Sequence, residues 1–77
     1  MNQAILFNDD LAFDKEQDAW CFTALLSAQV ITVYFHSMQL KRLIHIDTCT
    51  KFDLEELVEL WLEKNEPEGN TIHIQMG

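Results

Sequence analysis

Two adjacent eight-residue segments, 19–26 and 29–36, constrain the fold of this chain more than any other feature. Both are rich in aromatic and β-branched residues, which favour the pleated surface of a β-sheet. Only Ser27 and Ala28 separate them, so we predict a β-hairpin. The connection lacks the Asn-Gly or Asp-Gly of tight turns, which leaves a loop of more than two residues open.

Alternation along these strands predicts which side chains share a face. The first strand has Trp20, Phe22, Ala24 and Leu26 on one face and Cys21, Thr23 and Leu25 on the other. In the second strand, Ile31, Val33 and Phe35 oppose Val30, Thr32, Tyr34 and His36. Because both faces carry apolar groups, helices should cover one of them. The other is expected to be partly covered or used for self-association.

The segment before the hairpin predicts a short strand and a loop. The apolar run Ala4–Phe7 ends at asparagine and aspartate residues, which hydrogen-bond their own backbone and terminate strands. Residues 14–18 are almost wholly polar or charged, as in a solvated loop. We expect Leu11 and Phe13 to anchor the loop that precedes them.

The segment after the hairpin predicts two helices and a last strand. A serine cap and an apolar stripe favour a helix over 38–44, followed by a break at 47–51. A second helix begins at Asp53, or one turn earlier at Thr48 or Thr50. Residues 71–75 alternate as a final strand. The predicted order β, β, β, α, α, β indicates an α+β fold, with a small antiparallel sheet and both helices packed on one face.

Length and charge narrow the possible functions. A chain of 77 residues is too short for two cores, so residues 1–77 should form a single domain. With 13 acidic and 5 basic residues the net charge is −8, which disfavours nucleic acids and anionic membranes as partners. Polar residues interrupt the longest apolar stretch, 19–35, so no transmembrane helix is expected. Two cysteines are too few for a disulfide framework, which predicts a cytoplasmic protein.

The three histidines are the first candidates for chemistry. His36 precedes Ser37, but neighbouring strand residues point to opposite faces, and a helix cap explains the serine. His45 and Cys49 would form half a zinc site if a helix ran through both, and no second pair completes it. His73 alternates with isoleucines as an exposed strand residue. We predict no catalytic residue, metal site or cofactor, with a metal-binding or catalytic role for His36, His45 and Cys49 as the alternative.

Four segments resemble a family of small bacterial proteins known as domain-of-unknown-function family 1488. They are Met1–Asp10 (MNQAILFNDD), Ala19–Ala24 (AWCFTA), Phe52–Leu57 (FDLEEL) and Glu68–Ile74 (EGNTIHI). None is a catalytic signature, because these are strand, turn and cap residues. The resemblance implies an α+β fold and no assigned activity.

Two binding hypotheses follow. The first is a non-enzymatic, cytoplasmic accessory protein of bacteria that binds another protein or forms a homodimer, through aromatic side chains of the hairpin and second helix. The second is a regulator that presents an acidic helix face to a basic protein in place of nucleic acid. The candidate interaction residues are Trp20, Tyr34, Phe35, Trp61, Glu55, Glu59 and Glu63.

Overall fold

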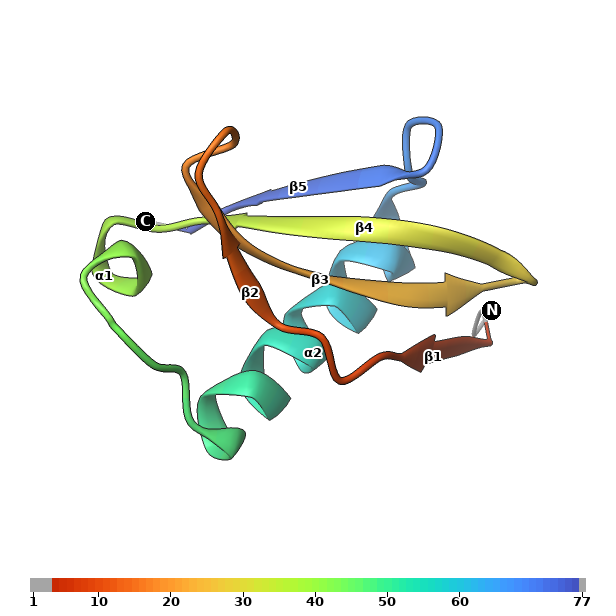
Figure 1. Cartoon of the computed structure of the whole chain (residues 1–77). Coiled ribbons are helices and arrows are strands. Elements are labelled where there is room, and N and C mark those ends of the chain that lie inside the picture. The colour runs from red at the N-terminus through yellow and green to blue at the C-terminus, as the bar shows by residue number, and fades with distance from the viewer. Residues whose placement is uncertain (1–3, 77) are drawn as a thin grey trace.

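The chain forms one mixed sheet with a long helix across one face. A computed structural model describes residues 4–76. Its elements are β1 (Ile5–Phe7), β2 (Ala12–Asp14), β3 (Ala19–Leu26), β4 (Gln29–His36), α1 (Met38–Lys41), α2 (Thr48–Lys64) and β5 (Thr71–Gln75) (Figure 1). Within that span, the five-stranded sheet and two helices confirm the predicted α+β class.

The centre of the sheet is the predicted hairpin of β3 and β4. Its antiparallel register places Leu26 opposite Gln29, so the connection is a two-residue turn rather than a longer loop. Ser27 and Ala28 form this turn with φ angles of 50° and 68°. Positive φ at both central positions is what type I′ turns require, and it usually selects Asn-Gly. The turn therefore holds two residues in a backbone region that their side chains disfavour.

The sheet edge beside β3 contains a strand that the sequence prediction missed. β1 pairs with the end of β3 and β2 with its beginning. Between the Phe7–Ala24 and Ala12–Cys21 pairs, the edge has residues 8–11 where β3 has only residues 22 and 23, which defines a bulge with two extra residues. Phe13, expected to anchor a loop, instead belongs to β2, because the pairing resumes after the bulge.

The last strand corrects the expectation of an antiparallel sheet. β5 lies beside β4 and runs parallel to it, with Val33 opposite Ile72 and Phe35 opposite Ile74. The physical reason is the crossover: α1 and α2 carry the chain back to the starting end of β4 before β5 begins. The strand order is β1-β3-β4-β5, with β2 also paired to β3.

The core lies between the sheet and α2. Leu54 and Val58 of α2 are buried against the same sheet face as Phe22, Val33 and Ile72. This is the face that carries Trp20 and Phe35 in the hairpin register. Figure 1 shows α2 crossing one side of the sheet, while α1 sits beyond the end of β4. The long helix alone therefore covers most of this face.

The helix boundaries follow from local hydrogen bonds. Ser37 caps α1 as predicted, accepting from the Leu40 N–H at 3.2 Å. The helix is shorter than expected because the Trp20 indole N–H donates to the Leu40 carbonyl at 2.7 Å, the acceptor that Ile44 would need to extend it. α2 begins at Thr48, the earliest of the predicted starts, since the Asp47 carboxylate caps the helix by accepting from the Thr50 N–H at 2.7 Å.

Candidate functional site

One sheet face has no helix over it among residues 4–76, and we call it the open face (Figure 1). The strand registers and alternation define its members. They are Leu6, Ala12, Asp14, Ala19, Cys21, Thr23, Leu25, Val30, Thr32, Tyr34, His36, Thr71, His73 and Gln75. Among these strand positions the one residue with a formally charged side chain, histidine aside, is Asp14 of the edge strand β2, although the chain has 13 acidic and 5 basic residues. The nearest carboxylates on this side are at the β2 edge.

The hairpin end of the open face is apolar. Leu25 of β3 stands opposite Leu6 of β1 and Val30 of β4, which makes a row across three strands. Leu6 and Val30 are 68% and 59% exposed. Directly opposed side chains on one sheet face lie close enough to touch, so the row forms one continuous apolar surface.

The other end of the open face carries a histidine pair. His36 Nε2 and His73 Nδ1 lie 2.9 Å apart, in hydrogen-bonding contact between β4 and β5. The His73 ring is nearly parallel to the neighbouring rings of Tyr34 and His36, with centroid separations of 5.1 Å from each. One ring must donate its N–H and the other must accept, so at least one imidazole is neutral.

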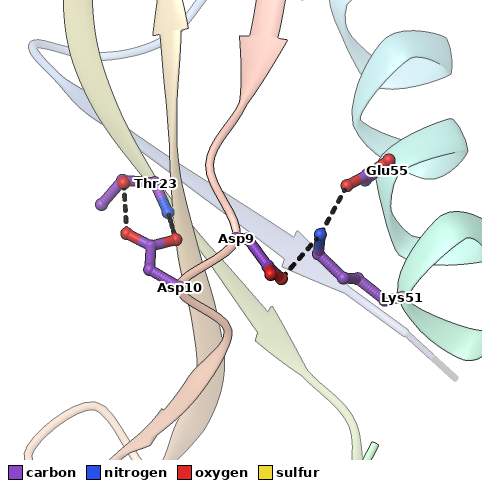
Figure 2. Close-up of polar contacts among 5 residues, drawn as sticks. All are labelled: Asp9, Asp10, Thr23, Lys51 and Glu55. Carbon is purple, nitrogen blue, oxygen red and sulfur yellow. Dashed lines mark hydrogen bonds and ion pairs between the residues drawn. The ribbon is translucent and has the colours of Figure 1, made fainter. Parts of the chain in front are cut away.

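Polar groups at the bulge tie the open face to the β2 edge. The Asp10 carboxylate accepts from the Thr23 N–H at 2.9 Å and from the Thr23 hydroxyl (Figure 2). It replaces the backbone carbonyl that an unbroken edge strand would offer to β3.

Burial, and then the charges of Asp14 and Asp10, raises the pKa of the Cys21 thiol. The thiol therefore stays protonated at neutral pH and is a poor nucleophile.

The same bulge reaches the helix on the opposite side of the sheet. Lys51 Nζ lies 3.2 Å from an Asp9 carboxylate oxygen and 3.3 Å from Glu55 of its own helix (Figure 2). The hydrogen bond to Asp9, and to a lesser degree that to Glu55, raises the pKa of Lys51, against the opposing effect of burial. Consecutive aspartates thus point to different faces, one toward β3 and one toward α2.

The predicted aromatic interaction residues do not lie together on one surface. Trp20 and Phe35 are 8% and 0% exposed, because their strand face is the one that α2 covers. This burial corrects their assignment to an interaction surface. Tyr34 lies on the open face and is half-buried. Trp61 is half-buried and lines a shallow hollow beside β5, next to the exposed edge of His73.

The predicted acidic face is only partly free. Glu55 is paired with Lys51, whereas Glu59 and Glu63 are exposed. One of the three predicted carboxylates therefore already has a basic partner within the chain. An ion pair that is intact within the domain weakens the case for a three-carboxylate surface aimed at a basic protein.

The half-site for zinc that was considered as an alternative does not form on a helix. His45 lies outside α2, which begins at Thr48, so the helical spacing to Cys49 does not apply. His36 lies at the end of β4 and contacts His73 instead. Among residues 4–76, no group of three metal-ligating side chains comes together. The histidine pair was not predicted from the sequence, because it depends on the parallel register of β4 and β5. The signal was present in the outward alternation of both histidines.

Neither helix within residues 4–76 combines the length and hydropathy needed to span a bilayer.

Comparison with known proteins gives no match to a family profile and none to a curated protein. A match is found to the crystal structure of a protein of unknown function from the DUF1488 family of Shewanella loihica PV-4. The TM-score is 0.68 at 30% identity, over 99% of this chain and 94% of that one.

The fold and the open face define a small α+β domain with a half-covered mixed sheet. The chain belongs to the DUF1488 family, which confirms the resemblance inferred from its sequence.

Proposed function

We propose that this chain is a non-enzymatic, cytoplasmic protein-binding domain of bacteria that acts through its open face. The observation that carries the proposal is the absence of carboxylates, lysine and arginine from the β1, β3, β4 and β5 positions of this face, in a chain with a net charge of −8; Asp14, the one acidic strand residue of the face, lies in the edge strand β2. Charged residues are depleted at the centres of protein interfaces, where aromatic and apolar groups are retained. The row Leu6, Leu25 and Val30 supplies the apolar contact, and Tyr34 supplies an aromatic one.

The occupant that the charges favour is a second copy of the chain. Two copies that each carry a net charge of −8 repel one another over most of their surfaces. They can approach closely where neither presents carboxylates, which is the case for the β1, β4 and β5 positions of the open face; Asp10 and Asp14 lie at its β2 edge. A two-fold interface also requires one patch to be complementary to itself, as an uncharged sheet face is. Two sheets packed face to face bury their side chains in a layer about 10 Å thick.

Light scattering of the purified chain tests this proposal, with a matched pair of variants. Val30→Glu places a carboxylate on the open face, and Leu60→Glu places one on the outer side of α2; the two side chains are 59% and 52% exposed. We expect the wild type to be a dimer. Leu60→Glu should leave the dimer intact. Val30→Glu should dissociate it, because like charges opposed across an interface cost several kcal/mol of binding free energy. A monomeric wild type, or equal behaviour of the two variants, contradicts a second copy as the occupant.

A further inference from the structure

We propose that His36 and His73 form a binding site for a divalent first-row transition metal ion of the Ni²⁺ and Cu²⁺ type. The pair lies at the end of the open face away from the apolar row. His36 is six residues along β4 from Val30, or about 20 Å at the rise of a strand. The inference therefore stands apart from the proposed function and concerns a different set of side chains.

The spacing of the two nitrogens favours this class of ion. His36 Nε2 and His73 Nδ1 are 2.9 Å apart. An ion bound to both at the usual imidazole distance of about 2.0–2.1 Å would subtend an N–metal–N angle of about 90°. Right angles between neighbouring ligands are those of the square-planar, tetragonal and octahedral geometries that Ni²⁺ and Cu²⁺ adopt with nitrogen and oxygen donors. A tetrahedral zinc ion would need the nitrogens farther apart.

The surroundings hold the ligands and admit an ion. The His73 ring lies next to those of Tyr34 and His36, with interplanar angles of 17° and 20°, so the two histidine rings are already close together. His73 is exposed and His36 is half-buried, so water can complete the coordination sphere. The carboxylates on this side, Asp10 and Asp14, add a negative field that attracts a cation.

Binding changes the tautomer of one ring and turns both rings, because the two nitrogens that point at each other in the hydrogen bond must then point at one ion. In the free chain, one nitrogen of the pair carries the proton of the hydrogen bond. When both nitrogens bind the ion, that proton moves through water to the other nitrogen of the same ring, and both imidazoles stay neutral.

Calorimetric titration of the untagged chain with Ni²⁺ tests the site. We expect one ion per chain. His36→Gln and His73→Gln should each lower the Ni²⁺ affinity by at least about tenfold. Removing a residue that only hydrogen-bonds to a metal ligand already costs about this much, and each of these variants removes a ligand itself. His45→Gln is the matched control, because His45 is an exposed histidine in the loop between α1 and α2, outside the sheet, and the variant should bind as the wild type does. Cys49→Ser should also be silent, which excludes the exposed thiol.

Each remaining outcome decides the question. Absence of saturable binding by the wild type overturns the proposal, as does a Ni²⁺ affinity that survives in both His36→Gln and His73→Gln. Circular dichroism of these variants checks that they fold, which is expected because neither ring belongs to the core. Val30→Glu should leave Ni²⁺ binding unchanged, so failure of the metal site and failure of the dimer are distinguishable.

Discussion

Replacement of Ala28 by glycine should stabilise the domain, although glycine usually weakens helices and strands. Ala28 has a φ of 68° in the hairpin turn. An alanine in this left-handed region costs about 1–2 kcal/mol, whereas glycine adopts it freely but loses about 0.5–1 kcal/mol of additional chain entropy on folding. The midpoints of these ranges leave a net stabilisation of about 0.7 kcal/mol. For a domain of this size the melting temperature should rise by about 3–6 °C.

The control is the same substitution at Ala12. Ala12 is exposed in the extended backbone of β2, so Ala12→Gly loses the entropy without relieving a left-handed residue. It should destabilise the fold by about 0.5–1 kcal/mol. Thermal and urea unfolding followed by circular dichroism measure both variants. If Ala28→Gly loses as much stability as Ala12→Gly, the argument from the turn geometry is refuted.

Two further predictions concern the core and α2. Leu54→Ala should lower the free energy of unfolding by about 2–5 kcal/mol, because Leu54 is 1% exposed. Leu60→Ala, at a site 52% exposed, should change it by less than about 0.5 kcal/mol in the same urea titration. The Thr50 N–H donates to the Asp47 carboxylate and lowers the pKa of Asp47. The stability that this cap contributes is therefore present above the ordinary aspartate pKa. It is lost as the pH falls through the lower pKa that Asp47 has in the folded state. Asp47→Asn keeps an acceptor, and its stability should fall less between about pH 5 and pH 2 than that of the wild type; equal slopes would exclude this role.

The sequence contained enough information for the elements and for the two faces of the hairpin. Alternation in 19–26 and 29–36 depends on local backbone geometry, and the structure retains it. The direction of β5 was not predicted, because the pattern of Thr71–Gln75 fits a parallel or an antiparallel neighbour equally well. It follows instead from the path of the two helices that lead back to the start of β4. β2 escaped prediction because the bulge divides the edge into strands of three residues each.

The candidate site shows the same division between local and long-range information. Size and aromaticity suggested Trp20 and Phe35 as contact residues, but their burial is decided by the face on which α2 packs. Tyr34, one position away, is on the uncovered side. The contact between His36 and His73 joins residues 37 positions apart. No local pattern encodes such a contact, since it requires the register of two strands that are joined through both helices.

The bulge at Asn8–Leu11 limits how copies of this domain could join edge to edge. At that edge the Asp10 carboxylate already occupies the Thr23 N–H, and the flanking strands are only three residues long, so an added strand would find few free partners. At the opposite edge, β5 has a longer uncovered side in the described part of the chain. If the sheet were extended, growth would proceed from one side only. Two domains joined through β5 would use up both growing ends, so the assembly would close as a pair and could not propagate into a fibre.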